Sequence, residues 1–599
     1  MKTEHITVEK SLFVLAILLA LGLRLWHLGQ APLSDFEASW ALQALHLSRG
    51  DSLSLGPSPG YVLLTGLIFF LIESSNATAR LWPAIAGTLL VGLPWLLEAG
   101  SPRRGGSPII GRNAAIILAF GLAIDPGLVA LSRLAGSPML ALSFGLFALG
   151  CIYVRRPVWA GVFGGLALLG GPAVLQGGLV LLLVWAAGEL VGRFGALGGN
   201  AGRRPAMTGF DRSARNGLIA AGGTVLLAGT LFLSFPQGLG ALASVIPAYL
   251  AGWVKPSGVP AVRLLAALVI YQPLALVFGL TNAVRGWTQK DERSVWMSLW
   301  ALVALLLALL YPGRQVSDLA WVIVPLWGLA AFEIARQLHV ESGERLPAIG
   351  QGVLIFILLA LFWLNLAGLS QAGGDLQVYR LRWAVILGTL ALGAVTTILV
   401  GLGWSAPAAQ RGLSWGLGGA LFFYTVSSLW GVSQLRANGE QELWTPTPAI
   451  DQAKQLVVTL GDLSEWKTGR RDAIDILAVN PTPSLEWLLH DWEQVEYASD
   501  IKAEGLPSVI LAPESASSPS LAAAYRGQDF AWQVYPNWSG ALPPDWAEWL
   551  VFRKAPQKVE HIILWARADV FPGGTLVPGG ESNPSSPPED TNPEEGGVK

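Results

Sequence analysis

Residues 21–51 read LGLRLWHLGQAPLSDFEASWALQALHLSRGD. An apolar run ends inside this stretch, and two acids, Asp35 and Glu37, follow it. Small and apolar residues then recur at helical spacing: Ala38, Trp40, Ala41, Leu42 and Leu45. This pattern predicts an amphipathic helix that lies along a membrane surface and holds an acid where lipid head groups meet water.

The two acids stand at the start of that helix. Ser34 or Asp35 is suited to cap it, because both side chains accept hydrogen bonds from the free N–H groups of a first helical turn. If the helix begins near Phe36, residues two apart point about 200° away from each other. Asp35 and Glu37 then cannot share one face, so one of them performs acid–base chemistry or neither does.

Composition places most of the chain in a membrane. The 599 residues have a mean hydropathy of +0.49, and 13% of them are charged, where a soluble domain has about 25%. The formal net charge of −2 suggests no concentrated basic surface for nucleic acid. Cys151 is the single cysteine, so no disulfide can form within the chain.

Apolar segments long enough to cross a bilayer recur along the first 430 positions, and they predict about 13 transmembrane helices. They lie near residues 11–29, 81–98, 113–131, 138–154, 157–172, 175–192, 217–235, 262–281, 294–311, 318–336, 351–372, 383–404 and 412–431. Residues 61–72, YVLLTGLIFFLI, are too few to cross comfortably and are expected to lie in or dip into the interface.

Lysine and arginine gather in alternate loops, which the positive-inside rule assigns to the cytoplasm. These residues are Lys2, Lys10, Arg103, Arg104, Arg112, Arg155, Arg156, Arg193, Arg203, Arg204, Arg212, Arg215, Arg285, Lys290, Arg293, Arg336 and Arg345. The N-terminus is therefore expected in the cytoplasm, while the loop at 30–80 and everything after the last span face outward. Arg380 and Arg382 fall on the outer side, against the pattern.

Three regions follow from these patterns: a multi-pass membrane domain at 1–432, an extracytoplasmic α/β domain at 433–572, and a disordered tail at 573–599. In the second region, short β-type runs such as DILAVN and PSVILAP alternate with helical ones such as PSLEWLLHDW. The tail is rich in proline, glycine, serine and acid, a composition that cannot form a core.

Several motifs resemble those of the GT-C membrane glycosyltransferases, particularly family 39, which includes protein O-mannosyltransferases and lipid A aminoarabinose transferases. Residues 21–51 are similar to the first outer loop of that family. NATARLWPAIAGTLLVGLPWLL resembles the opening of the second span, DPGLVALSRLAGSPMLALSFGLFALG the third and fourth, and YPGRQVSDLAWVIVPLWGLAAFEIAR a late helix. PSLEWLLHDWEQVEY resembles outer domains attached to some members.

The resemblance implies a specific activity. Such enzymes transfer a sugar from a polyprenyl-phosphate donor to a hydroxyl or similar acceptor on the outer face, with inversion. An acid of the first outer loop, here Asp35 or Glu37, acts as general base. Basic residues neutralise the departing phosphate, and the candidates on the outer side are Arg80, Arg133, Lys255 and Arg314. The acceptor is an unidentified glycan, lipid or protein, and no cofactor is expected, with a divalent metal left open.

The chain also departs from the family pattern. A gapless match aligns the usual aspartate with Phe36, a second acid is replaced by Ser137, and the lysine before the interfacial prolines is missing from LGPSPGY. An inactive GT-C-like scaffold and a lipid or sugar transporter therefore stay open as alternatives. His27 and His46 lack company for a metal site, and Arg24, at the end of the first span, is expected to snorkel outward.

Overall fold

The structure, a computed structural model, describes residues 8–51, 54–99, 110–193, 212–338, 344–371, 375–436, 439, 441–501, 506–514, 523–538, 540 and 542–575. The chain divides into two compact units. The first comprises Met1–Ile450 and Val534–Lys558, and the second Asp451–Gln533 and Val559–Lys599. Most of the expected disordered tail lies outside the described residues, as do the cytoplasmic assignments of Lys2, Arg103, Arg104, Arg203 and Arg204.

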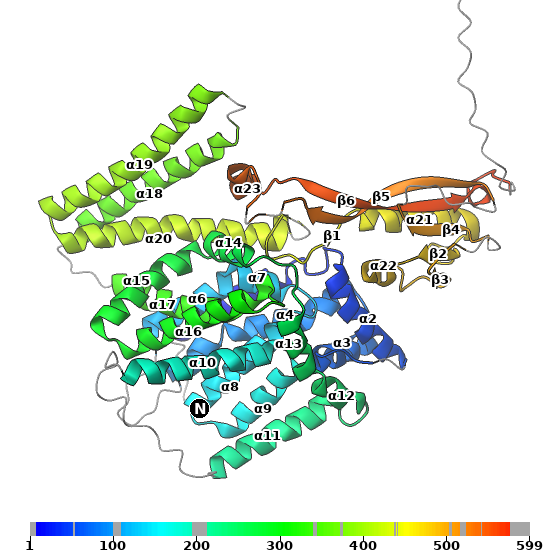
Figure 1. Ribbon diagram of the computed structural model, residues 1–599, viewed down its shortest axis with the longest axis horizontal. Helices are drawn as coiled ribbons and strands as arrows, with labels where there is room; N and C mark the ends of the chain where they lie inside the picture. Colours follow the sequence, from blue (N-terminus) through cyan, green and yellow to red (C-terminus); the bar gives the residue numbers. More distant parts are fainter. Residues whose placement is uncertain are drawn as a thin grey trace, which may run out of the picture. The chain divides into compact units, whose positions relative to one another are not determined.

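The first unit is almost entirely helical (Figure 1). Its first helices are α1 (Val8–Leu25), α2 (Asp35–Arg49), α3 (Pro59–Leu71), α4 (Asn76–Leu90), α5 (Leu93–Ala99), α6 (Arg112–Ile124), α7 (Pro126–Ser132), α8 (Met139–Tyr153), α9 (Pro157–Leu169), α10 (Ala173–Arg193) and α11 (Arg212–Gly229). Its later elements are α12 (Gln237–Ala243), α13 (Val245–Val254), α14 (Ala261–Tyr271), α15 (Pro273–Gln289), α16 (Glu292–Leu310), η1 (Val316–Leu319), α17 (Ala320–Gln337), α18 (Arg345–Leu369), α19 (Leu376–Gly403), α20 (Ala406–Trp430), the π-helical turn η3 (Gly431–Leu435), the short strand β1 (Ala449–Ile450) and α23 (Trp546–Phe552).

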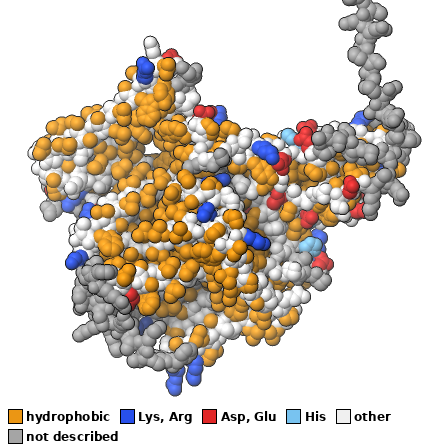
Figure 2. Space-filling view, viewed as in Figure 1, with side chains coloured by type: hydrophobic (Ala, Val, Ile, Leu, Met, Phe, Trp, Pro, Cys, Tyr) orange, Lys and Arg blue, Asp and Glu red, His pale blue; other side chains and the backbone are white. Residues whose placement is uncertain are grey.

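Helices long and apolar enough to cross a membrane number seven in the described parts of the chain, or up to nine if each of two bent pairs is one span. Three further apolar helices, α3, α8 and α9, are shorter. Figure 2 shows hydrophobic side chains over most of the visible face of the helices. The polytopic helical class is thus confirmed, while the count of about 13 spans stays a prediction.

Two of the predicted spans are broken rather than continuous. The first bends by 56° between α6 and α7 at Asp125, and the second bends by 93° between α14 and α15 at Gln272. A proline follows each of these residues, Pro126 and Pro273, and a residue before proline is disfavoured in the helical region. Asp125 accordingly has extended dihedral angles, φ −64° and ψ 121°.

One helical segment was missed in the sequence. The structure contains α12 and α13, which together form a candidate span over Gln237–Val254, a stretch to which the apolar pattern assigned no helix. Glycine, proline and polar residues interrupt the apolar run there, which reads FPQGLGALASVIPAYLAGWV.

Small residues allow close packing between helices of this unit. A Cβ atom on Gly161 of α9 would lie 2.0 Å from the carbonyl oxygen of Gly217 on α11, so only glycine fits at this crossing. Membrane helices use small residues in this way to bring their backbones together. Ala16 and Ala20 of α1 are likewise fully buried, as are Ala115 and Ala119 of α6, in the core that the two helices share.

The second unit is an α/β domain, as the sequence predicted. Its elements are α21 (Ala453–Thr468), β2 (Ile476–Val479), α22 (Pro483–Leu488), β3 (Val495–Ala498), β4 (Val509–Pro513), β5 (Tyr525–Pro536), β6 (Gln557–Arg567) and η4 (Ala568–Val570). The strands of this unit form one mixed sheet in the order β5-β6-β4-β2-β3. β2 runs parallel to β3 and β4, with Ile476 opposite Val495 and Val509, and β4 runs antiparallel to β6.

The division into compact units does not follow the domain bounds 1–432, 433–572 and 573–599, which stay a prediction. Residues 433–450 belong to the helical unit, and residues 534–558 return to it because α23 packs against α18. Trp549 of α23 is fully buried in the helical core.

Candidate functional site

The loop between α1 and α2, which is called the first outer loop after the side expected from the sequence, ends at the start of α2. Ser34 caps this helix, as the sequence predicted: its Oγ accepts a hydrogen bond from the backbone N–H of Glu37 at 3.4 Å. The Glu37 carboxylate in turn accepts from the backbone N–H of Ser34 at 3.1 Å, which completes a capping box. At the other end, Gly50 ends the helix with φ 83°, a left-handed conformation that suits glycine.

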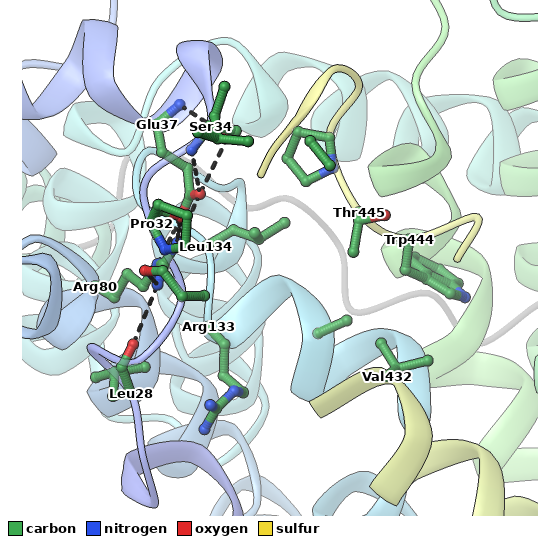
Figure 3. A pocket seen from close by; sticks show the side chains of 15 residues that line it. Leu28, Pro32, Ser34, Glu37, Arg80, Arg133, Leu134, Val432, Trp444 and Thr445 are labelled. Carbon is green, nitrogen blue, oxygen red and sulfur yellow. Dashed lines mark hydrogen bonds and ion pairs between the residues drawn. The ribbon is translucent and has the colours of Figure 1, made fainter. Parts of the chain in front are cut away.

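Glu37 is held far more firmly than a cap requires. Its Oε1 accepts from Nε of Arg80 at 2.7 Å and from the backbone N–H of Ala135 at 3.0 Å, and its Oε2 accepts from Nη2 of Arg80 at 2.9 Å and from both donors of Ser34 at 3.1 Å. The side chain of Glu37 is 2% exposed and that of Arg80 is 4% exposed. The acceptor positions of this carboxylate are therefore filled by protein groups (Figure 3).

Arg80 organises the loop that precedes α2. Besides its two bonds to Glu37, it donates through Nη1 to the carbonyl oxygens of Leu28 and Ala31, at 3.2 and 2.9 Å, and through Nη2 to that of Pro32 at 2.9 Å. Every N–H of the guanidinium group thus has an acceptor within the protein. In this state Arg80 fixes the backbone of the loop and has no N–H left for a ligand.

Arg133 plays a similar part at the end of α1. Its Nη1 donates to the carbonyl oxygens of Leu23, Arg24 and Trp26, the last at 2.8 Å, and its Nη2 donates to that of His27. The last carbonyl groups of a helix lack partners within the helix, and a cation there also suits the helix dipole. Arg133 therefore caps α1 and fixes the point where the first outer loop begins.

Glu37, Arg80 and Arg133 line one small cavity of about 50 Å³ (Figure 3). Residues from the other end of the unit complete it: Val432, Trp444, Thr445, Pro446, Ala449 and Ile450. A single water needs about 10–15 Å³ by this measure, so the cavity has room for a few waters and is too small for a sugar. Glu37 is thus brought against the segment that follows the last helix of the membrane domain, α20.

Asp35 and Glu37 face different surroundings. Asp35, the first residue of α2, is half-buried. It does not belong to the described residues that line the cavity. The separation follows from the helical geometry of residues two apart. Phe36, at the position of the family aspartate, is 48% exposed, and Ser137, at the position of the second acid, is buried with no hydrogen bond from its hydroxyl to any described residue.

Lys255 and Arg314 belong to two loops that are joined by hydrogen bonds from Ser257, and the described lining of this cavity includes neither residue. Lys255 ends α13 and is exposed. Arg314 donates to the carbonyl oxygen of Val259 at 3.1 Å, and its own carbonyl accepts from Ser257 at 2.6 Å. The four predicted cations therefore form two groups: Arg80 of α4 and Arg133 after α7 are buried against the loop between α1 and α2, and Lys255 and Arg314 lie in the loops after α13 and α16.

The prediction that Arg24 snorkels outward is wrong, since its side chain is fully buried. Its Nε donates to Oγ of Ser132 at 3.1 Å, and its Nη atoms donate to the carbonyl oxygens of Ala123 and Leu122, at 3.2 and 3.1 Å. These carbonyls end α6 at its break, where no helical N–H follows to satisfy them. The break thus supplies acceptors that draw the arginine inward.

Asp125, at the same break, is a buried acid that sequence reasoning passed over. It is fully buried and accepts from the backbone N–H of Leu128 at 2.8 Å, from Nε2 of Gln272 at 3.0 Å and from Nε1 of Trp327 at 2.7 Å. Gln272 marks the other broken helix pair, so the two breaks are joined by one hydrogen bond. The signal in the sequence was a polar residue directly before proline inside each apolar run.

A second buried acid, Glu442, lies in the segment assigned to the outer domain by sequence. It is fully buried and accepts from the hydroxyl of Tyr271. Nε of Arg436 lies 2.5 Å from one of its oxygens, and Nε of Arg553 lies 3.6 Å from the other. The guanidinium of Arg553 also lies over the rings of Tyr271 and Trp549, at 4.9 and 4.7 Å. Because Tyr271 and Glu442 are 171 residues apart, local sequence patterns could not predict this cluster.

No group of three or more His, Cys, Asp and Glu side chains that could hold a metal ion occurs in the described part of the chain. The expectation that no cofactor is needed stays a prediction.

Comparisons with known proteins give structural matches alone. No family model matches the chain, and no curated protein matches its sequence. ArnT from Cupriavidus metallidurans, crystallised with undecaprenyl phosphate, matches with 14% identity and a TM-score of 0.47 over 93% of this chain and 98% of that one. Its apo form gives a TM-score of 0.48 at the same identity and coverage. An oligosaccharyltransferase from Archaeoglobus fulgidus matches over 82% of this chain and 64% of that one, with 14% identity and a TM-score of 0.38. These are GT-C glycosyltransferases, the class that the sequence resembles.

Proposed function

We propose that this chain is a membrane glycosyltransferase that moves a sugar from a polyprenyl-phosphate donor to an acceptor at the outer membrane face, with inversion. The observation that supports this most is the construction of the first outer loop. Arg80 and Glu37 fix residues 28–37 through buried hydrogen bonds, so the start of α2 is held in one position. A base that must meet an acceptor at an anomeric carbon needs such positioning. The same loop carries the resemblance in sequence.

Asp35 is the better candidate for the general base. Glu37 already accepts hydrogen bonds from Arg80, Ser34 and Ala135 on both of its oxygens, so it has no position for the proton of an acceptor. Asp35 begins α2, faces away from Glu37 because the two residues are two apart on a helix, and is half-buried where Glu37 is fully enclosed. We therefore assign Glu37 the role of a positioning residue.

The reaction then balances as a single displacement. The acceptor oxygen forms a bond to the anomeric carbon while the bond from that carbon to the phosphate oxygen breaks. The hydroxyl proton passes to Asp35, and the electron pair of the broken bond leaves with the polyprenyl phosphate. Cations near the phosphate stabilise the departing charge. Arg80 contributes positive charge but has no free N–H, whereas Arg133, Lys255 and Arg314 stay candidates for direct contact.

One alternative is a GT-C-like scaffold that binds the donor lipid without transferring its sugar. The specific observations in its favour are Phe36 at the position of the family aspartate and Ser137 at that of the second acid. A transporter is the less favoured class. Transporters use broken helices to bind ligands, but here the acid at the break, Asp125, already accepts three hydrogen bonds from the protein.

A lipid analysis followed by two substitutions tests the proposal. The protein is purified in mild detergent, and native mass spectrometry identifies lipids that co-purify or bind on addition; a polyprenyl-phosphate sugar is expected. Asp35→Asn should then abolish release of polyprenyl phosphate from that donor, while Glu37→Gln should weaken folding as well as turnover. Full activity in both variants contradicts the assignment. Binding of the donor without turnover in the native protein identifies the scaffold instead.

A further inference from the structure

A large apolar pocket of about 670 Å³ opens among the last helices of the first unit. The helices concerned are α18, α19 and α20, which Figure 1 shows as a hairpin and its neighbour, together with α14 and α23. Its wall is aromatic and aliphatic, with Phe356, Phe362, Trp363, Trp383, Phe423 and Trp546 among the larger side chains. α18 and α19 are both candidate membrane spans, so the pocket is within reach of a lipid chain.

Two arginines stand in the wall of this otherwise apolar pocket. Arg436 follows the π-helical turn η3 and is 31% exposed, whereas Arg553 ends α23 and is 3% exposed. The carboxylate of Glu442 pairs with both arginines: Nε of Arg436 is 2.5 Å from its Oε1, and Nε of Arg553 is 3.6 Å from its Oε2. Glu442 is not among the described residues that line the pocket. The two cations and one anion leave a net charge of +1 at this point of the wall.

Arg553 is incompletely satisfied. Its Nε makes no hydrogen bond to any described residue, since its nearest charged neighbour, Glu442, is 3.6 Å away. Its Nη1 makes two long bonds, of 3.4 Å, to the carbonyl oxygens of Trp549 and Leu550. A buried guanidinium whose hydrogen bonds are this long gains from a further anionic acceptor in the pocket. The rings of Tyr271 and Trp549 hold it in place at the pocket.

The charged wall of this pocket is close to the cavity of the first outer loop. Tyr271, which contacts Arg553 and Glu442, packs edge-on against Trp444 with ring centroids 6.5 Å apart. Trp444 lines the cavity that also contains Glu37 and Arg80. One aromatic pair therefore separates the two arginines from the loop that carries the proposed base.

We propose that this pocket binds the polyprenyl chain of the donor lipid, with the donor phosphate on Arg436 and Arg553. This inference rests on the proposed function and assigns a binding site to its lipid substrate. A sugar-bearing polyprenyl phosphate is a phosphodiester with one negative charge, which matches the net charge of the wall. The bare polyprenyl phosphate is a monoester that approaches two negative charges, and its second charge would be buried with no cation to pair it, so the site favours the loaded donor over the spent lipid. Charge-assisted bonds to the two guanidinium groups supply the recognition.

Matched variants separate the two parts of the site. Arg436→Gln removes a cation at the pocket, and Arg411→Gln removes one from α20 that pairs with Glu344 and lies away from it. Ala360→Trp fills the pocket from α18, and Ile357→Trp places the same ring on a neighbouring exposed position that does not line it. Binding is measured on the full chain by native mass spectrometry with undecaprenyl phosphate, its hexosyl diester and phosphatidylglycerol, and thermal unfolding is recorded for each variant.

The expected result is binding of the hexosyl diester ahead of undecaprenyl phosphate and of phosphatidylglycerol. Arg436→Gln should weaken binding of the hexosyl diester about tenfold because one charge-assisted bond to the phosphate is lost. Ala360→Trp should weaken binding by about the same factor because the indole ring occupies the space of the polyprenyl chain. Both control variants should bind the diester as the native protein does. Equal binding of phosphatidylglycerol, or unchanged binding in both pocket variants, overturns the site. Asp35→Asn should retain binding. If the native protein binds the donor but does not turn it over, the lipid pocket is supported and the proposed transferase activity is contradicted. If the native protein turns the donor over and the pocket variants are as active as it is, the transferase is supported and the lipid pocket is contradicted.

Discussion

Glu37 and Arg80 form a bidentate ion pair across 43 positions of the chain, with both side chains almost completely buried. The pair is completed by backbone groups on both sides, the carbonyl oxygens of residues 28–32 on the arginine and the N–H groups of Ser34 and Ala135 on the acid. Because each charge is fully hydrogen-bonded, the pair ties α4, the first outer loop and the turn after α7 into one rigid junction.

Breaking that pair should destabilise the membrane domain strongly. Arg80→Gln leaves a buried carboxylate without its cation, and such a loss costs about 3–5 kcal/mol. The matched control is Arg411→Gln, whose ion pair with Glu344 is about a quarter exposed and should contribute about 0–1 kcal/mol. Unfolding in detergent, followed by circular dichroism, compares the two. Equal stability of both variants would show that the buried pair is not the main support of this loop.

Removing the helix cap should loosen α2 without unfolding the protein. Ser34→Ala deletes the hydroxyl that accepts from Glu37 N–H and donates to its carboxylate, and the loss of such a cap costs about 0.5–2 kcal/mol. Ser39→Ala, on the same helix, removes only an exposed bond to a backbone carbonyl. Hydrogen exchange of the first turn of α2 should rise in the first variant alone. If Asp35 is the base, turnover falls with it.

The start of α2 could be predicted from sequence because its determinants are local: a serine, a glutamate three residues later and an apolar stripe. The α/β class of the second unit followed from short alternating runs for the same reason. The distant partners of Arg24, Asp125 and Glu442 could not be predicted, since they lie 98 to 202 residues away. Helix breaks at Asp125 and Gln272 were readable as polar-proline pairs, but their meeting depends on the tertiary fold.

The joint between the two broken helices should depend on Trp327. Trp327→Phe removes the indole N–H that donates to Asp125 at 2.7 Å and leaves that oxygen without a partner, which costs about 1–3 kcal/mol. Trp185→Phe is the control, because Trp185 is 59% exposed on α10. Thermal unfolding should shift for Trp327→Phe and hardly at all for Trp185→Phe. A shift of the same size in both would mean that ring size, not the hydrogen bond, is responsible.

The second unit should lose stability in acid through Asp569. The hydrogen bonds from Arg567, at 2.6 and 2.9 Å, hold the pKa of this carboxyl below its usual value of about 3.9. A depressed pKa stabilises the fold above the unfolded value, and this contribution disappears as the pH falls through the folded value. The free energy of unfolding should therefore drop below about pH 4.

Asp569→Asn should be less stable at neutral pH and should flatten this acid-induced drop. The native protein and the variant are compared by urea unfolding of the full chain at several pH values. Hydrogen exchange of peptides from β6 reports unfolding of this unit, after correction for the pH dependence of the intrinsic exchange rates. A drop of the same steepness in the variant would assign the acid sensitivity to other carboxyl groups.

The burial of Arg24 has a consequence for biogenesis. The carbonyl oxygens and the hydroxyl that bind this arginine belong to residues 98 to 108 positions further along the chain. At a synthesis rate of about 5–20 residues per second, α1 enters the bilayer about 5–20 s before those partners emerge from the ribosome. During that interval the cation must remain in the aqueous insertion channel or at the lipid head groups, and it can move inward only once α6 and α7 have been inserted. Assembly of the membrane domain therefore waits for α7.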